Sequence, residues 1–219
     1  VGFRITGGGK ISEGALAVWL RKGEVDGGQV MTETYSENRF MRALSEIRKL
    51  TREDPGDFLP QVERLCAGAG VAFVLTQELP KSGANGVARW LSPEKALIQL
   101  SIRWGWADIF WFTFFHEAFH ILRHDVKTPY VDGKGINGQD TKAEAVADQF
   151  AGDFLINPDD WAGFVEAGNR TAAAVRQFAD SVTIDPGIVV GRMQYEGTIA
   201  YSHLTTLKTR FEWVDEADD

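Results

Sequence analysis

Cysteine is nearly absent from this chain: among 219 residues, Cys66 is the only one. One thiol excludes an intramolecular disulfide framework and a zinc ribbon built from several thiolates, and it favours a reducing compartment. Long hydrophobic runs are missing as well. The longest, residues 109–122, is interrupted by His116, Glu117 and His120 and is too short to cross a bilayer. We therefore expect a chain without a membrane span.

Positive charge is scarce too. Lys and Arg number 23 against 31 Asp and Glu, which gives a net charge of −8 at pH 7. Domains that hold nucleic acid through its phosphates are usually strongly basic, so we do not expect this chain to bind nucleic acid directly. No signal-peptide pattern opens the sequence. Because the first residue is Val1 rather than Met, we expect a fragment or a trimmed product, which a DNA-binding domain could precede.

The spacing of apolar residues predicts the order of helices and strands. We expect residues 1–35 to form a loose lead-in over 1–10 and a short helix that stops at Gly23. Residues 36–158 are expected to form the core, with a loop over 125–140, and residues 159–219 a C-terminal extension that is helical to about Gln194. Within the core we expect helices over 36–50, 57–69, 107–124 and 141–156, and strands over 71–75, 86–91 and 96–102.

The sequence His116-Glu117-Ala118-Phe119-His120 lies inside a strongly helical stretch. Four residues turn an α-helix by about 400°, so both imidazoles project from one face, one turn apart. At that separation both rings can reach one tetrahedral metal ion. Glu117 would face a zinc-bound water, whose pKa falls to about 7, and could accept its proton. His116 and His120 are therefore candidate metal ligands, and Glu117 is a candidate general base.

A motif with three fixed positions also arises by chance, and paired histidines on a helix can be ordinary core or surface residues. Against this, the helix is apolar nearly all round, which is typical of a buried helix. Burying two imidazoles and a carboxylate there costs several kcal/mol unless something compensates, and a divalent cation does so. The surroundings therefore favour a metal site.

A third ligand is expected from the helix predicted over 141–156. Glu144 and Asp148 share one stripe of that helix with Ala151 and Leu155, which should be buried. A Glu-x-x-x-Asp pair after His-Glu-x-x-His is the arrangement of zincins that use glutamate as third ligand, where the second acid orients a histidine through its free ring N–H. We assign Glu144 to the metal and Asp148 to that orienting role. The alternative is an exposed helix face with solvated acids.

The two remaining histidines are weaker candidates. On a straight helix His124 lies about 12 Å along the axis from His116, too far to share one ion, and we expect it at a helix C-terminus. His203 and Tyr201 could donate a hydrogen bond to the oxyanion of a tetrahedral intermediate, although a packed or exposed histidine is the commoner case. Cys66 is expected in the core.

These residues resemble the ImmA/IrrE family of zinc metallo-endopeptidases, and more closely its long version, which is often attached to an XRE-type DNA-binding domain or an antitoxin-like protein. The resemblance covers about residues 15–214. It is carried by residues 112–122 around the two histidines, 144–151 (Glu-Ala-Val-Ala-Asp-Gln-Phe-Ala), 154–158, 90–101, and 186–192 through 201–203. Two departures stand out: Phe119 replaces a usual glycine, and Val146 stands where many relatives carry an acid. The second supports Glu144 as the ligand.

The resemblance implies an α+β, zincin-like metallopeptidase fold, in which a sheet of three strands or slightly more packs on the His-Glu-x-x-His helix. It implies a Zn²⁺ cofactor and a cytoplasmic protease that cleaves a DNA-binding repressor or antitoxin-type regulator, relieving repression in a prophage, mobile-element or stress circuit. The alternative is a non-catalytic antitoxin or transcriptional-regulator subunit that keeps the metallopeptidase fold. A zinc hydrolase of small molecules is a third, weaker candidate.

Two expectations concern the substrate and the C-terminus. In such zincins an edge strand commonly binds extended substrate by strand addition, and residues 96–103 are the candidate strand. Residues 172–193 resemble a helix-turn-helix in pattern. However, Asp and Glu outnumber Lys and Arg over residues 165–219, so we expect these helices to pack on the core rather than on DNA.

Overall fold

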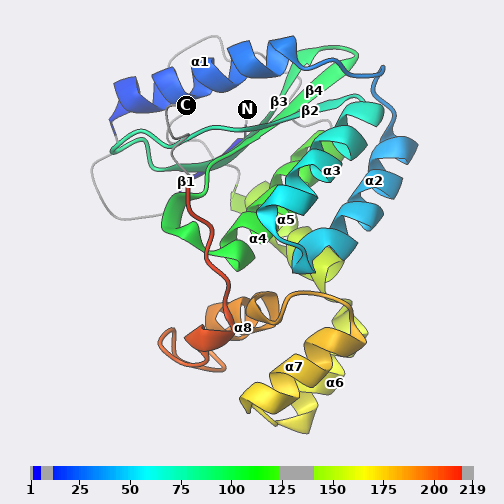
Figure 1. Ribbon diagram of the computed structural model, residues 1–219, viewed down its shortest axis with the longest axis vertical. Coiled ribbons are helices and arrows are strands. Elements are labelled where there is room, and N and C mark those ends of the chain that lie inside the picture. The colour runs from blue at the N-terminus through cyan, green and yellow to red at the C-terminus, as the bar shows by residue number, and fades with distance from the viewer. Residues whose placement is uncertain (1, 6–11, 124–140, 214–219) are drawn as a thin grey trace.

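The fold is α+β, with one small mixed sheet (Figure 1). The computed structural model describes residues 2–5, 12–123 and 141–213. Its strands are β1 (Gly2–Ile5), β2 (Val71–Leu75), β3 (Ala84–Ser92) and β4 (Lys95–Leu100), in the spatial order β1-β3-β4-β2. β3 pairs antiparallel with β1 and β4, and β4 pairs parallel with β2. The three predicted strands are confirmed; the predicted lead-in is wrong over residues 2–5, which form β1.

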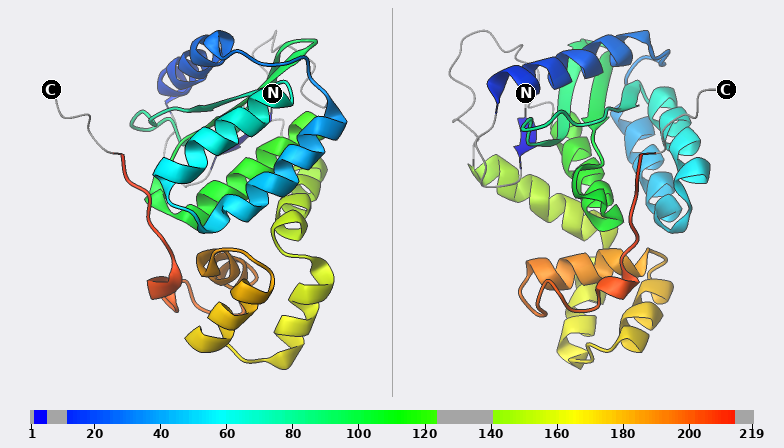
Figure 2. Two further views of the ribbon diagram at one scale, coloured as in Figure 1. Left: turned by 45° about the vertical axis from the view of Figure 1, so that its right-hand side comes forward. Right: turned by 60° about the vertical axis from the view of Figure 1, so that its left-hand side comes forward.

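Helices cover both faces of this sheet (Figures 1 and 2). They are α1 (Glu13–Gln29), α2 (Glu37–Lys49), α3 (Pro55–Gly68), α4 (Ala107–Leu122), α5 (Thr141–Leu155), α6 (Pro158–Ala167), α7 (Ala172–Ser181) and α8 (Pro186–Tyr195). α1 lies on one face, α3 and α4 pack on the other, and α5 packs against α4. In the described ranges, no helix combines the length and hydrophobicity needed to cross a bilayer.

α1 is longer than the sequence predicts, because it continues through Gly23 and Gly27 to Gln29. Both glycines are buried where the helix meets the sheet. A Cβ at Gly23 would overlap the side chain of Gln99, and one at Gly27 would lie 2.7 Å from Leu97 Cδ1. The glycines therefore allow close packing here rather than ending the helix, and the predicted stop at Gly23 is wrong.

β4 is an interior strand, with β3 on one side and β2 on the other. The prediction that residues 96–103 form an edge strand for substrate is therefore wrong. Gln99 shows the reason: its side chain is fully buried, and its Nε2 donates a hydrogen bond to the Trp19 carbonyl at 2.8 Å. An apparently exposed polar position in the alternating pattern is in fact covered by α1.

Two arginines fix the C-terminal end of α5. Arg48 of α2 donates from Nε to the carbonyls of Phe154 and Leu155, both at 3.0 Å. Arg192 of α8 donates from Nη1 to the carbonyls of Gly152 and Ile156, at 3.0 and 3.2 Å. The last carbonyls of a helix have no hydrogen-bond partner within the helix. The two guanidinium groups donate hydrogen bonds to carbonyls that would otherwise be removed from water without a partner. They also hold α5 in position beside α4.

The C-terminal helices form a group at one end of the molecule (Figure 1). α8 packs on α4 and α7 packs on α8, so the expected packing on the core is made by α8. After α8 the chain returns to the start of α4. There the Phe211 amide donates to the Gly105 carbonyl at 2.8 Å and the Ala107 amide donates to the Thr209 carbonyl at 3.0 Å. We call residues 208–211 the returning segment.

Candidate metal centre

α4 carries the histidine motif and is buried on nearly every side, as its apolar sequence predicts. The side chains of Trp111, Phe114 and Phe115 are fully buried around it. The motif residues are buried with them: His116 is 1% exposed, His120 4% and Glu117 0%. Three ionisable side chains are thus held inside the protein on a single helix. Such burial is costly unless the groups are paired with each other or with an ion.

His116, His120 and Glu144 converge at one point between α4 and α5, where they could hold a metal ion. The Nε2 atoms of the two histidines are 3.2 Å apart. Glu144 Oε2 lies 3.2 Å from His116 Nε2, and Glu144 Oε1 lies 3.5 Å from His120 Nε2. The two helices therefore bring together the residues that the sequence assigns to a metal, although 24 positions separate His120 from Glu144.

Asp148 contacts the far side of the His116 ring, with Oδ1 2.9 Å from Nδ1. A neutral imidazole that donates from Nδ1 carries its lone pair on Nε2, the atom that faces His120 and Glu144. In that tautomer Asp148 would hold the ring in place and leave Nε2 available to a metal. A carboxylate behind a ligand histidine is the usual second partner in such sites. Ala147 and Ala151 on the same helix are fully buried against the core.

The charge of Glu144 is set by competing effects. Burial raises its pKa, but when the histidines are protonated a hydrogen bond from His116 and the positive charge of both rings outweigh burial, so the pKa is lower than usual. The carboxyl is therefore ionised at neutral pH and available as an anionic ligand. Its side chain is 22% exposed, which does not fit the alternative of a freely solvated acid.

Gly86 of β3 makes room for Glu117. A Cβ at this position would lie 2.6 Å from Thr113 Cγ2, 2.8 Å from Leu100 Cδ2 and 3.0 Å from Glu117 Cγ. Only a residue without a side chain lets the sheet approach α4 this closely. The sequence gives no local sign of this role, because Gly86 appears there only as part of a predicted hairpin strand.

Both departures from the family pattern have a place in the structure. Phe119 is 9% exposed and packs on Phe150 of α5, with ring centroids 5.1 Å apart, so α5 accommodates the larger side chain. Val146 is 46% exposed, whereas Glu144 and Asp148 on the same helix reach the histidines.

The remaining candidates are not among the three residues of this cluster. His124 is outside the described residues. Tyr201 is 72% exposed, and His203 is exposed as well; the carbonyls of both accept hydrogen bonds from Gln194 Nε2, at 3.0 and 3.1 Å. Cys66 is buried in the core, as expected.

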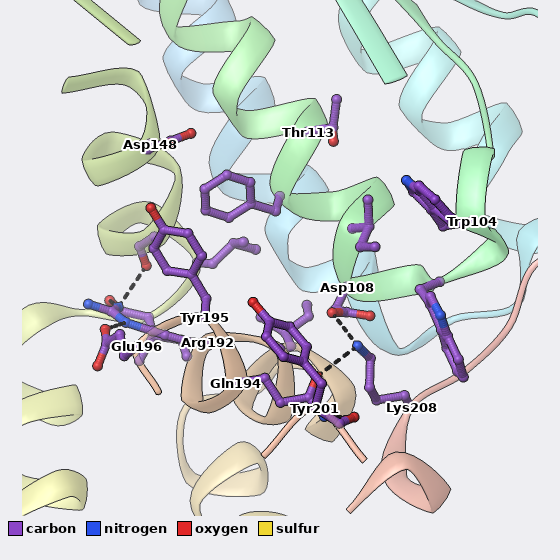
Figure 3. Close-up of a pocket in the computed structure, with 18 of the residues that line it drawn as sticks. Trp104, Asp108, Thr113, Asp148, Arg192, Gln194, Tyr195, Glu196, Tyr201 and Lys208 are labelled. Carbon is purple, nitrogen blue, oxygen red and sulfur yellow. Dashed lines mark hydrogen bonds and ion pairs between the residues drawn. The ribbon is translucent and has the colours of Figure 1, made fainter. Parts of the chain in front are cut away.

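A pocket of about 880 Å³ adjoins this centre and is not apparent in the sequence. β3, the residues just before α4, α4 itself, α5, α8 and the chain after α8 line it. Figure 3 shows Asp148 on its α5 wall and Asp108 beside Lys208. Lys208 Nζ is 2.9 Å from Asp108 Oδ2, and both side chains are at least nine-tenths buried. Burial raises the pKa of Asp108, and the Lys208 charge opposes that increase.

The chain was compared with protein-family models, with curated proteins and with solved structures, and none of these comparisons found a match.

Proposed function

We propose that this protein is a zinc-dependent endopeptidase, and that it cleaves a DNA-binding repressor or antitoxin-type regulator. The distances within the cluster carry the proposal. Zinc binds nitrogen at about 2.0–2.1 Å in a tetrahedron, which separates neighbouring ligand atoms by about 3.3–3.4 Å. The two imidazole Nε2 atoms are 3.2 Å apart, and the Glu144 carboxylate places Oε2 3.2 Å from that of His116 and Oε1 3.5 Å from that of His120. One ligand atom from each residue is thus close enough to the others to share an ion. The donor set of two imidazoles and one carboxylate is also one that catalytic zinc sites use.

In this proposal His116, His120 and Glu144 hold the metal, and Asp148 keeps the His116 ring in place. When bound, Zn²⁺ would supply Lewis acidity and lower the pKa of water. Glu117 acts as the general base: its carboxylate accepts a proton from the attacking water and later donates it to the leaving amine. Glu117 follows His116 in α4 and is fully buried. Proton transfer to this carboxylate would therefore be shielded from bulk water.

The substrate class rests on the family resemblance, and the catalytic role rests on the number of ligands. A purely structural zinc site is closed by four protein ligands, whereas a catalytic site has three and leaves one position open. Within the described part of the chain, three candidate ligands meet in this cluster. That number favours a catalytic centre over the alternative of a non-catalytic regulatory subunit.

The test is cleavage of the regulator encoded beside this protein by the zinc-loaded chain, followed by mass spectrometry. Glu117→Gln keeps the size of the side chain and removes the base, so we expect cleavage to slow by about 100-fold or more. Glu63→Gln on the exposed face of α3 is the matched control and should cleave at the wild-type rate. Zinc content is measured for each variant. Equal rates for wild type and Glu117→Gln would refute the mechanism, and zinc binding without cleavage by wild type would favour the non-catalytic alternative.

A further inference from the structure

The pocket beside the metal cluster has features of a ligand site. Its volume of about 880 Å³ lies in the range of small-molecule sites, about 300–1,000 Å³. Three large aromatic side chains line it while remaining open to solvent: Trp104 is 50% exposed, Tyr195 65% and Tyr201 72%. Exposed large apolar side chains that line one pocket commonly mark a binding site. In Figure 3 the two tyrosines rise from α8 and the chain after it, facing α4.

Two buried polar atoms of α4 in this pocket lack a hydrogen-bond partner among the described residues. They are Asp108 Oδ1 and Thr113 Oγ1, on side chains that are 9% and 2% exposed as residues. Asp108 already binds Lys208 through its other oxygen, Oδ2. A buried polar atom without a partner destabilises the protein, and a ligand that supplies the missing donor removes that cost. The step of five positions from Asp108 to Thr113 corresponds to about 7.5 Å along the helix axis.

The charges around the pocket favour a cation over an anion. Four acidic residues line it, against two basic ones. Lys208 pairs with Asp108, and Arg192 pairs with Glu196 at 2.9 Å and Asp153 at 3.5 Å, so the two cations leave a formal excess of two negative charges in the lining. An anionic ligand would therefore meet uncompensated negative charge, whereas an amine would reduce it.

We propose that this pocket binds a small aromatic amine, with the amine at Asp108, the ring system among the exposed aromatic side chains, and a second donor at Thr113. The ligand would also contact Asp148, which lines the same pocket and holds His116. A bound molecule would thus reach the residue that orients a metal ligand without contacting the metal ligands themselves. The site is defined without reference to peptidase activity and can exist whether or not the protein cleaves a peptide bond.

Calorimetric titration of the full chain with three matched probes tests the chemistry. Tryptamine has an amine and an indole N–H, 1-methyltryptamine lacks the indole N–H, and indole-3-propionate carries a carboxylate in place of the amine. We expect tryptamine to bind at least about tenfold more tightly than indole-3-propionate, because a charge-assisted hydrogen bond is at stake. Asp108→Asn should weaken tryptamine by about tenfold, and Thr113→Val should weaken tryptamine while leaving 1-methyltryptamine unchanged.

Two glycine variants locate the binding site. Gly152 lines the pocket with nothing closer than 3.9 Å to an added Cβ, so the side chain of Gly152→Leu should occupy pocket volume and weaken both amines at least about tenfold. Gly163→Leu on exposed α6 is the matched control, because nothing lies within 4 Å of it, and it should bind both amines as wild type does. Absence of tryptamine binding to wild type, equal affinity for tryptamine and indole-3-propionate, or undiminished binding by Gly152→Leu would each overturn the proposal.

Discussion

Zinc binding should stabilise this protein by an amount that depends on the free zinc concentration relative to Kd. A ligand that binds only the folded state adds RT ln(1 + [L]/Kd), about 2.7 kcal/mol at 100 times Kd. For a domain of this size each kcal/mol raises Tm by about 2–4 °C, so we expect an increase of about 5–11 °C over protein kept in a chelator. Differential scanning calorimetry at fixed free zinc measures it.

Three variants should differ in this zinc-dependent stabilisation according to the role of the residue that is changed. Glu144→Gln removes an anionic ligand; a 100-fold weaker affinity leaves only about 0.4 kcal/mol of stabilisation at the same zinc concentration. Asp148→Asn removes the partner of His116, a change that typically costs 10–100-fold in affinity, and should leave about 0.4–1.4 kcal/mol. Glu117→Gln should keep the full increase, because Glu117 is assigned to the base and not to the metal.

The order of these responses is the critical result. If zinc raises the Tm of Glu144→Gln as much as that of wild type, the carboxylate does not bind the metal and the cluster has been misassigned. If Glu117→Gln loses the increase along with Glu144→Gln, the distinction between ligand and base fails. Titration with Ca²⁺ is the control, since two imidazoles are poor ligands for a cation that prefers oxygen.

Three further outcomes are expected. Gly86→Ala should lower the free energy of unfolding by about 1–3 kcal/mol, because the added methyl crowds Thr113 and Leu100 most closely and Glu117 as well. Gly28→Ala, with nothing within 4 Å of the added methyl, should not, and urea unfolding of both variants checks this. Burial raises the pKa of the Cys66 thiol, so a chromogenic disulfide reagent at pH 8 should react with it only after unfolding, and rapid labelling of native protein would contradict the packing. Burial also raises the pKa of Asp185 above the ordinary value of about 3.9, so its contribution to stability is present below that pH and is lost as pH rises through the higher pKa. Asp185→Asn should therefore gain stability over wild type between pH 4 and pH 7, and urea midpoints that shift equally in both proteins would count against this.

Helices and candidate metal ligands could be predicted from the sequence where a local pattern of residues is sufficient to indicate them. The apolar sequence of α4 and the spacing of His116 and His120 give both the helix and the shared face, because the helical repeat is fixed. The stripe that joins Glu144 to Ala151 likewise gives the buried face of α5. What joins these two helices is tertiary packing, and only the structure shows that Glu144 meets both imidazoles.

One contact accounts for the wrong prediction of a helix stop at Gly23. Gly23 resembles a helix stop and Gln99 resembles an exposed strand position. In the structure the Gln99 side chain fills the space beside Gly23 that a Cβ would otherwise occupy. Because the glutamine is accommodated beneath α1, the helix continues past Gly23. β4 lies inside the sheet because it pairs with both β3 and β2. Local propensity could not show this, because Gly23 and Gln99 are distant in sequence and come into contact only in the folded protein.

The pocket was beyond prediction for a different reason. Its walls come from four segments of the chain that lie far apart in sequence, and Asp108, Gln194 and Lys208 share no spacing that marks them as neighbours. Lys208 Nζ nevertheless donates to Gln194 Oε1 at 3.2 Å and pairs with Asp108.

The returning segment limits how the protein can be shortened. An expression variant ending before residue 208 would lose the strand-like bridge between Trp106 and Arg210, and it would leave the Asp108 carboxylate in an apolar setting without its countercharge. Deletions made to isolate the first two-thirds of the chain would therefore damage the first turn of the histidine-bearing helix. Loss of zinc affinity in such a truncation would report that damage, and would say nothing about whether the C-terminal helices take part in chemistry.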